Sequence, residues 1–321
     1  MSKSLSLGSK IAVFLALALI FGATMVALAL REPSHRESDS YISANEKRVD
    51  KTFQVGSGGK LVIKADEGSI SVTGTPRNEV TVHVRARGAE SRLNKLDISV
   101  EQSGNVVRAI SEYKRRFMNW FGDDNIEVEF EVEVPQNFDL QLNTAGGDIT
   151  ILNVKGTIGG ETSGGDLDLS NLDGLVRLGT SGGNVAVKDS KGDFTISTSG
   201  GNMRVESIVG AMDFESSGGN IEVRDSDGKL RASTSGGDVH AALKDNKGID
   251  LETSGGNLVV QLPKSISAEI SAETTGGDVN CDFQFSGKLR EGSLRGKING
   301  GGNFIKLETS GGDIIINSVG G

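Results

Sequence analysis

A short motif, Gly-Gly followed by Asp or Asn, returns at a fixed interval through the second half of the sequence. It occurs ten times, and in the first six copies the second glycine lies 18 residues after the previous one. These six copies define a predicted turn ladder: Gly147, Asp148, Gly165, Asp166, Gly183, Asn184, Gly201, Asn202, Gly219, Asn220, Gly237 and Asp238. A fixed period indicates a repeat protein, in which each unit buries its apolar face against the next.

Each 18-residue unit contains two short segments in which apolar and polar residues alternate. In the unit from Gly201 to Gly219, residues 202–206 and 211–215 alternate, and Gly210 lies between them. Alternation with period two predicts strands, and glycine with Asn or Asp predicts turns. The sequence therefore predicts an all-β fold, a parallel β-solenoid with 18-residue coils, over residues 144–321.

The alternation also predicts which side chains face the interior. The inward columns include Leu167, Val185, Met203, Ile221 and Val239 on one side, and Phe194, Ile196, Met212, Phe214, Leu230 and Ala232 on the other. A Thr/Ser column before each Gly-Gly pair is in phase with these residues, which predicts hydroxyls turned inward at the corner. After Gly256 the spacing lengthens, which predicts insertions at 263–273 and 283–299 and one further coil at 310–321.

Residues 51–143 contain longer alternating segments and are predicted to form an N-terminal β cap, because the open end of a solenoid needs covering. Gly59 and Gly68 are again nine residues apart, which predicts a degenerate coil at the start of this region. Residues 31–50 are polar and mixed in charge, which is typical of a stalk without its own core.

The N-terminal residues 1–30 predict a signal anchor or a signal peptide. Residues 11–30 carry no charge and follow Lys3 and Lys10, and twenty apolar residues are long enough for one transmembrane helix. Ala27 and Ala29 also fit a signal-peptide cleavage site. In both cases the rest of the chain is expected to be extracytoplasmic. The predicted membrane contact is residues 11–30.

Composition excludes several classes of protein. The net charge of −9 argues against a nucleic-acid partner. Cys281 is the only cysteine, and the three histidines are far apart in sequence, so no metal and no cofactor is predicted. The Gly-Gly-Asx turns share a nine-residue half-turn with calcium-binding β-rolls, whose consensus is G-G-x-G-x-D-x-U-x. In this chain an apolar residue follows the Asx where the consensus has a further glycine, and the acidic sixth position is apolar too. The turns are therefore predicted to be structural.

One segment outside the repeat, residues 113–121, combines aromatic and basic side chains. Its membrane- or partner-contact candidates are Tyr113, Lys114, Arg115, Arg116, Phe117, Trp120 and Phe121. Such residues suit a bilayer interface or an anionic partner. They also suit a hydrophobic plug over the end of the solenoid. Both interpretations are open at this point.

The sequence predicts no enzyme. Catalysis on a solenoid needs carboxylates, or a base beside a basic group, that converge in a groove. Arg204 and Glu222 are predicted to be stacked neighbours, which indicates an ordinary cross-strand ion pair. A carbohydrate-processing activity would need a groove lined by carboxylates in the 263–299 insertions.

The repeats resemble the DUF4097 family of bacterial proteins proposed as adhesins. The pattern Thr-Ser-Gly-Gly-Asx followed by alternating apolar residues is clearest at 162–169, 180–187 and 198–205, and the resemblance covers roughly residues 50–321. The resemblance implies a bacterial, surface-associated β-solenoid, located in the periplasm or on the cell surface. Some members of the family are linked to cell-envelope stress responses. The family supplies no catalytic residues.

The function expected from these features is that of a non-enzymatic, membrane-anchored extracytoplasmic β-solenoid, acting as an adhesin or as a surface-binding or structural module. Its expected partners are a cell-surface glycan, an envelope component or a protein, and self-association is allowed. A cell-envelope stress sensor that contacts lipid or peptide is one alternative. Carbohydrate processing is the other.

Overall fold

The computed structural model describes residues 40–43, 46–113 and 126–320. The chain divides into two units, Met1–Ser38 and Asp39–Gly321, and every described residue belongs to the second. In the described ranges no helix is long and apolar enough to cross a bilayer. Residues 11–30, for which the transmembrane helix is predicted, lie outside these ranges, so the anchor stays a prediction.

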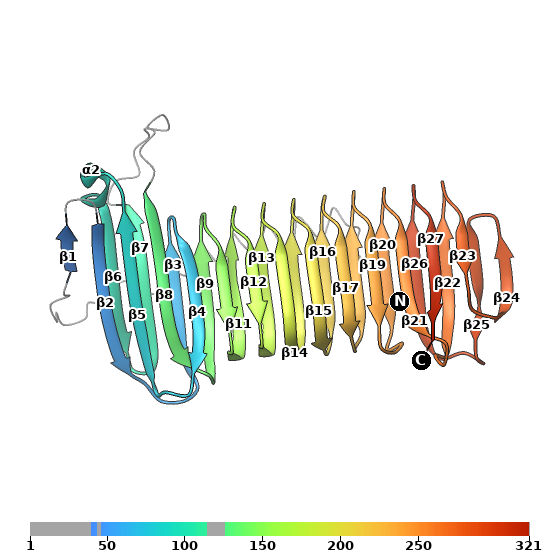
Figure 1. The fold of residues 1–321 in the computed structure, drawn as a ribbon, viewed down its shortest axis with the longest axis horizontal. Helices are drawn as coiled ribbons and strands as arrows, with labels where there is room; N and C mark the ends of the chain where they lie inside the picture. Colours follow the sequence, from blue (N-terminus) through green and yellow to red (C-terminus); the bar gives the residue numbers. More distant parts are fainter. Residues whose placement is uncertain (1–39, 44–45, 114–125, 321) are drawn as a thin grey trace, which may run out of the picture. The chain divides into compact units, whose positions relative to one another are not determined.

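The strands of the second unit stack in two facing walls (Figure 1). Wall one runs, in stacking order, through β6 (Leu96–Ser103), β7 (Val106–Tyr113), β3 (Gly59–Ala65), β9 (Phe138–Thr144), β11 (Lys155–Thr162), β13 (Asp173–Thr180), β14 (Val185–Thr198), β16 (Met212–Ser216), β18 (Leu230–Thr234), β20 (Ile249–Thr253), β26 (Asn303–Thr309), β22 (Ala268–Thr274), β25 (Ser293–Ile298) and β24 (Phe285–Arg290).

Wall two runs through β1 (Ser40–Ser43), β2 (Glu46–Gln54), β5 (Glu79–Arg87), β8 (Glu127–Pro135), β4 (Ser69–Thr75), β10 (Ile149–Leu152), β12 (Leu167–Ser170), β14, β15 (Met203–Val209), β17 (Ile221–Ser226), β19 (Val239–Leu243), β21 (Leu258–Pro263), β27 (Ile314–Val319) and β23 (Val279–Cys281). The strand β14 pairs in both walls, because it passes through the corner between them. A short helix, α2 (Glu90–Leu93), precedes β6.

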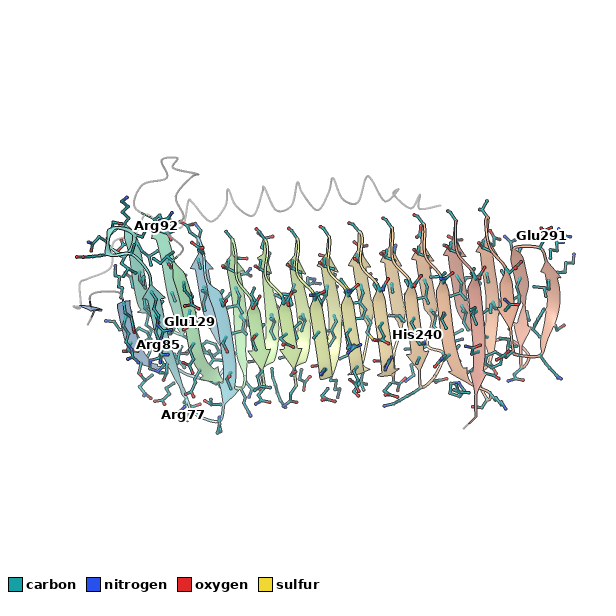
Figure 2. The ribbon with its side chains drawn as sticks, turned by 45° about the horizontal axis from the view of Figure 1, so that its top comes forward. Arg77, Arg85, Arg92, Glu129, His240 and Glu291 are labelled. Atoms are coloured by element: carbon teal, nitrogen blue, oxygen red, sulfur yellow. The ribbon has the colours of Figure 1, made fainter. Side chains whose placement is uncertain are left out.

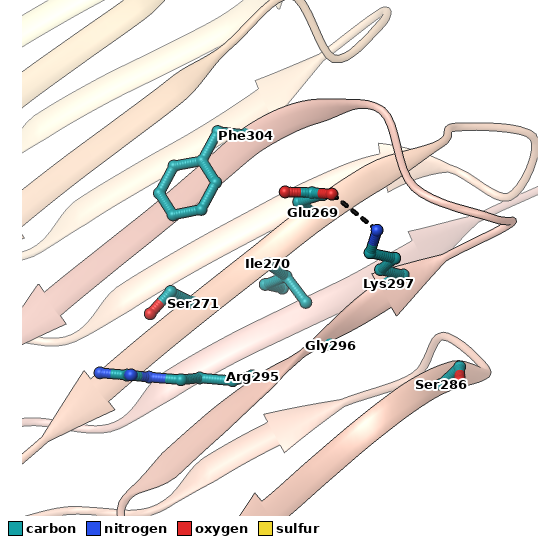
Figure 3. Close-up of a pocket in the computed structure, with 8 residues that line it drawn as sticks. All are labelled: Glu269, Ile270, Ser271, Ser286, Arg295, Gly296, Lys297 and Phe304. Atoms are coloured by element: carbon teal, nitrogen blue, oxygen red, sulfur yellow. Dashed lines mark ion pairs between the residues drawn. The ribbon is translucent and has the colours of Figure 1, made fainter.

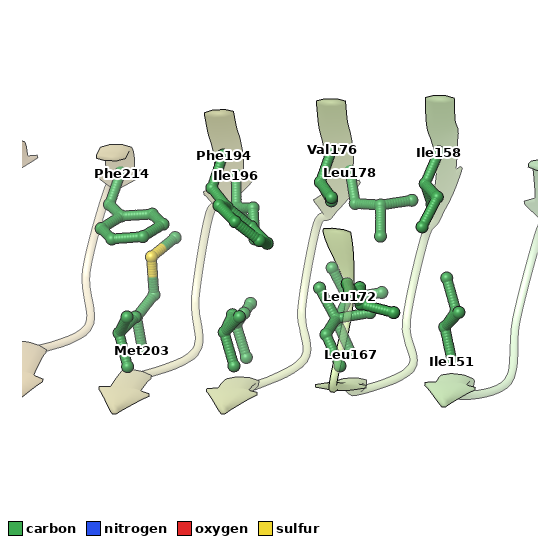
Figure 4. Packing of buried hydrophobic residues seen from close by; sticks show 14 of the residues in the cluster. Ile151, Ile158, Leu167, Leu172, Val176, Leu178, Phe194, Ile196, Met203 and Phe214 are labelled. Atoms are coloured by element: carbon green, nitrogen blue, oxygen red, sulfur yellow. The ribbon is translucent and has the colours of Figure 1, made fainter. Parts of the chain in front are cut away.

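The core lies between the walls and confirms the predicted inward columns. Strands of the regular coils pair in parallel with a register of one repeat, so that Val185 lies beside Met203 and Phe194 beside Met212. All the predicted inward residues are buried, with exposed fractions of 2 % or less for Phe194, Met203 and Phe214. Figure 4 shows the rings of Phe194 and Phe214 on one wall facing Met203 and its neighbours on the other. The predicted β-solenoid is therefore present over the repeats.

Each coil has a second corner, opposite the Gly-Gly-Asx turn, and its backbone conformation is not evident from the repeat spacing. A residue other than glycine has a positive φ there in five successive coils: Asn153, Asn171, Asp189, Ser207 and Asp225, with φ between 48° and 61°. The left-handed region is tolerated by Asn and Asp because their short side chains bond locally. The residue that follows is turned inward, so Val154, Leu172 and Ile208 are buried.

At the N-terminal end, the order of stacking differs from the order of the chain. The strands β3 and β4 pair in parallel with β9 and β10, so residues 59–75 form a coil next to residues 138–152. The segment between them folds back over the outer side of that coil as β5 to β8. Residues 40–50, predicted to be polar stalk, include β1 and the start of β2, because alternation from Val49 onwards lets β2 pair with β5.

At the C-terminal end, the last coil of the chain is not the last coil of the stack. The strands β26 and β27 lie between the coil β20–β21 and the coil β22–β23, and pair in parallel with both. In Figure 1 the red C-terminal strands accordingly stand among orange ones. The predicted insertion 263–273 mostly forms β22, and the predicted insertion 283–299 forms the antiparallel hairpin β24–β25.

Candidate functional site

The Gly-Gly-Asx turn ladder forms one continuous hydrogen-bonded column. The backbone N–H of each Asx donates to the side-chain oxygen of the Asx one coil earlier: Asp166 to Asp148 at 2.8 Å, Asn184 to Asp166 at 2.6 Å, Asn202 to Asn184 at 3.0 Å, Asn220 to Asn202 at 2.9 Å and Asp238 to Asn220 at 2.8 Å. Asp and Asn both carry a side-chain oxygen that can accept this bond, and Ser69 Oγ accepts the equivalent bond from Asp148 at 3.2 Å. The bonds therefore link successive coils.

The Thr/Ser column completes the same turns from inside. The hydroxyls of Thr162, Thr180 and Thr198 donate to the carbonyls of Gly147, Gly165 and Gly183 at 2.7–2.8 Å. These side chains are buried, as predicted from their phase with the inward residues. In the part of the chain that the structure describes, no three His, Cys, Asp or Glu residues cluster as a metal site would require. The side-chain oxygens of the Asx residues in the turn ladder accept hydrogen bonds from backbone N–H groups, so they stabilise the stack of coils.

Of the candidate contact segment 113–121, only Tyr113 is described; Lys114, Arg115, Arg116, Phe117, Trp120 and Phe121 lie outside the described residues. Tyr113 ends β7, and its backbone N–H donates to Asp66 Oδ2 at 3.0 Å. Its hydroxyl donates to Glu67 Oε2 at 3.3 Å. Both acceptors belong to the turn after β3, so these bonds tie the end of β7 to that turn. The choice between plug and binding loop stays open.

Tyr113 is expected to titrate at unusually high pH. Burial, followed by the charge of Glu67 and the hydrogen bond to it, raises the pKa of Tyr113 to about 12. The neutral hydroxyl is the form that donates, so the proton is retained through pH 10, where an ordinary tyrosine loses it. A spectrophotometric titration of a Tyr41→Phe variant should show a single midpoint near 12, which Glu67→Gln should lower. A midpoint near 10 would contradict the contact.

A charged surface covers wall two at its N-terminal end. Outward residues of β5 lie opposite acidic residues of β8, including Arg85 opposite Glu129 (Figure 2). His83 Nδ1 lies 2.5 Å from Asp50 Oδ1, and Arg48 Nε lies 2.9 Å from Asp50 Oδ2. Burial opposes ionisation of Asp50, but the His83 hydrogen bond and the Arg48 charge hold its pKa below the usual range. Asp50 is therefore paired both along its own strand, with Arg48, and across to β5, with His83.

The predicted ion pair on the regular part of wall two is confirmed. Arg204 Nε lies 3.2 Å from Glu222 Oε2, one coil away, and both side chains stand on the outer face. Arg224 pairs with the same carboxylate. An exposed pair of this kind contributes little to stability. This ion pair lies on wall two, in the regular coils.

An open groove of about 560 Å³ lies on wall one near its C-terminal end (Figure 3). Four strands contribute one outward row to it: Phe304 of β26, Glu269 of β22, Lys297 of β25 and Ser286 of β24 are register partners in that order. Lys297 Nζ lies 2.9 Å from Glu269 Oε1. Ser271 and Arg295 line the groove from the adjacent row. The groove therefore combines an aromatic ring with several polar side chains.

Phe304 is the unusual member of this group, because its side chain is 49 % exposed in a wall whose other aromatic side chains are buried or partly buried. The sequence offered a signal that was missed: Phe304 and Ile305 are adjacent apolar residues, so in a strand one of them must face solvent. Arg295 Nε donates to Glu273 Oε1 at 3.1 Å, which holds the guanidinium beside the groove. The exposed ring and the polar side chains beside it give the groove both an apolar face and hydrogen-bonding groups.

The architecture and the ladder define the class of protein: an all-β, parallel solenoid of 18-residue coils with antiparallel strands at both ends. The family model described as Toastrack DUF4097 matches residues 37–317, and the chain belongs to this family. The resemblance seen in the repeats is thereby confirmed. No curated protein matches the chain.

Three solved structures are similar to it at low sequence identity. One is a proposed adhesin of Bacteroides fragilis NCTC 9343, with 14 % identity, 86 % of this chain and 100 % of that chain covered, and a TM-score of 0.43. A proposed cell adhesion protein of Clostridium sporogenes ATCC 15579 has 15 % identity, coverage of 84 % and 99 %, and a TM-score of 0.27. A proposed lipid-binding protein of Parabacteroides distasonis ATCC 8503 has 10 % identity, coverage of 85 % and 95 %, and a TM-score of 0.27.

Proposed function

We propose that this chain is a non-enzymatic binding module of the bacterial envelope, an adhesin held at the membrane by residues 11–30. Its contact site is the groove around Phe304, and its ligand is a cell-surface glycan. The observation that carries the proposal is the exposed Phe304 ring in one row with Glu269 and Lys297. The uncharged segment 11–30 supports the anchor, and the expected location is extracytoplasmic.

The groove suits a sugar by its chemistry. An exposed aromatic face can stack on the C–H face of a pyranose ring, which is apolar, while hydroxyls at the ring edge need hydrogen-bond partners. Glu269 offers acceptors, and Arg295, Lys297 and Ser271 offer donors around the same space. The ion pairs Glu269–Lys297 and Glu273–Arg295 hold these groups in place before the ligand arrives. Preorganisation of this kind reduces the cost of binding.

The lining residues also support binding rather than hydrolysis. Among the described residues that line the groove, Glu269 is the only carboxylate, and it is paired with Lys297. Glycoside hydrolysis usually employs two carboxyl groups on opposite sides of the scissile bond. A carbohydrate-processing activity would need a second carboxylate to enter the groove. The geometry therefore supports a lectin-like contact.

The test is a glycan array with the full-length chain in detergent micelles, together with isolated peptidoglycan. Phe304→Ala should weaken binding at least about tenfold, since stacking and burial of one ring are worth roughly 1.5 kcal/mol or more. Val209→Ala is the matched control, because Val209 is 48 % exposed on a different part of the surface. Equal binding by both variants would overturn the proposed site. Release of free sugar from a bound glycan would favour carbohydrate processing instead.

A further inference from the structure

The two ends of the stack differ in a complementary way. At the C-terminal end, wall one continues for two strands, β25 and β24, beyond the last complete coil β22–β23, and wall two has no described strand there. At the N-terminal end, wall one continues for two strands, β7 and β6, beyond the coil β3–β4, whereas wall two continues for four: β8, β5, β2 and β1. Each end of the stack is therefore stepped: wall one extends further than wall two at the C-terminal end, and wall two extends further at the N-terminal end.

We propose that these steps join two copies of this chain head to tail, with β24 of one copy pairing with β6 of the next. Across such a joint, wall one would hold four strands between complete coils, two from each copy. Wall two would hold four as well, all from the N-terminal end of one copy. The walls would then continue at equal length, since neighbouring strands have the same spacing in both.

Strand direction agrees with this joint on both walls. Wall one is parallel from β7 to β22; β6 runs antiparallel to β7, and β24 runs in the direction of β22 after two antiparallel steps. In wall two, three antiparallel steps from β8 reverse β1 relative to β23. A second copy in the same orientation therefore presents antiparallel partners to both exposed edges. In the described part of the chain, β24 pairs only with β25, and β6 only with β7.

Side chains at the two edges are complementary in charge. One unbroken row of register partners crosses wall one from Glu101 of β6 to Lys288 of β24. Continued into the next copy, this row places Lys288 opposite Glu101, with Arg290 on the diagonal. All three side chains are exposed in the single chain. Opposite charges at such cross-strand positions stabilise a pair of strands.

An apolar side chain at the same edge lacks the cover that its neighbours have. Leu289 belongs to an inward row with Ala272 and Leu294, which are fully buried, yet Leu289 itself is 56 % exposed. It faces the side on which wall two ends earlier. The overhanging strands of the next copy's wall two would supply the missing cover. A head-to-tail contact of this kind does not close on itself and produces linear arrays.

Disulfide trapping tests the register of the joint. In a Cys281→Ala background, full-length chains in detergent micelles carry either Glu101→Cys or Lys288→Cys. Side-chain partners on adjacent antiparallel strands lie within disulfide range. Mild oxidation of an equal mixture should give a covalent dimer containing one chain of each kind, and the double variant should give a ladder of higher multimers. Lys188→Cys, on an exposed position in the middle of wall two, is the control.

Charge exchange gives a second readout. By sedimentation, Lys288→Glu and Glu101→Lys should each weaken self-association about tenfold, because attraction at the joint becomes repulsion. The chain with both changes should recover most of the affinity. The joint would be wrong if the mixed dimer were no more abundant than with the Lys188→Cys control. It would also be wrong if the chain were a monomer at every concentration, or if the single and double charge variants associated equally well. None of these readouts depends on the glycan proposal.

Discussion

Replacing Gly201 by alanine should lower the free energy of unfolding by about 3 kcal/mol or more. A Cβ at this position would lie 1.9 Å from the carbonyl oxygen of Gly183, the equivalent glycine one coil earlier. The clashing atom is backbone in a continuous ladder, so it cannot move without disturbing both neighbouring coils. Overpacking of this kind costs about 1–3 kcal/mol where side chains can yield, and more where they cannot.

The adjacent residue provides the control. A Cβ at Gly200 would meet its nearest neighbour, the carbonyl oxygen of Gly182, at 3.6 Å, an ordinary contact distance. Gly200→Ala should therefore change stability by no more than about 0.5 kcal/mol. Chemical denaturation followed by circular dichroism measures both variants. Similar losses in the two would show that the close approach at Gly201 is not what the turn requires.

Phe214→Ala should destabilise the protein by about 3–5 kcal/mol, the usual cost of removing a fully buried ring. Phe214 is 0 % exposed and lies in an inward row between Ile196 and Ala232. Ala232 is too small to fill the space that the ring would leave, and the hydrogen-bonded walls cannot collapse into it. The lower free energy of unfolding of Phe214→Ala should appear as a lower midpoint in chemical denaturation.

Two further variants test whether the loss of stability comes from the burial of Phe214 rather than from removing a phenylalanine as such. Phe214→Leu should recover part of the loss, since it restores apolar volume at the same place. Phe304→Ala removes the same ring from a position that is 49 % exposed and should cost about 1 kcal/mol or less. If Phe214→Ala and Phe304→Ala destabilised the chain equally, the assignment of Phe214 to the core would be wrong.

The candidate site was predictable only in part. The 263–299 insertions were named only as the place where a carboxylate-lined groove would have to lie for carbohydrate processing, and no residue of the groove was predicted. Phe304, however, follows that region in sequence and reaches the groove only because β26 pairs with β22. Pairing between strands that are distant in the chain depends on tertiary structure, so no local pattern indicated this neighbour. Tyr113 was named from composition, but its contact with Glu67 depends on a turn elsewhere in the sequence.

What the sequence determined by itself is the coil: its length, its two strands, its inward residues and the chemistry of its Gly-Gly-Asx turns. In a solenoid the nearest neighbour of a residue is its counterpart one repeat away, so a period in sequence becomes a contact in space, as between Val185 and Met203. Only the tertiary structure decided the order of coils at the ends. Coils that share the same turn residues can pair with one another in any order, so the pattern that specifies a coil does not specify which coil lies next to it. This is why β26 and β27 lie inside the stack although they are the last strands of the chain.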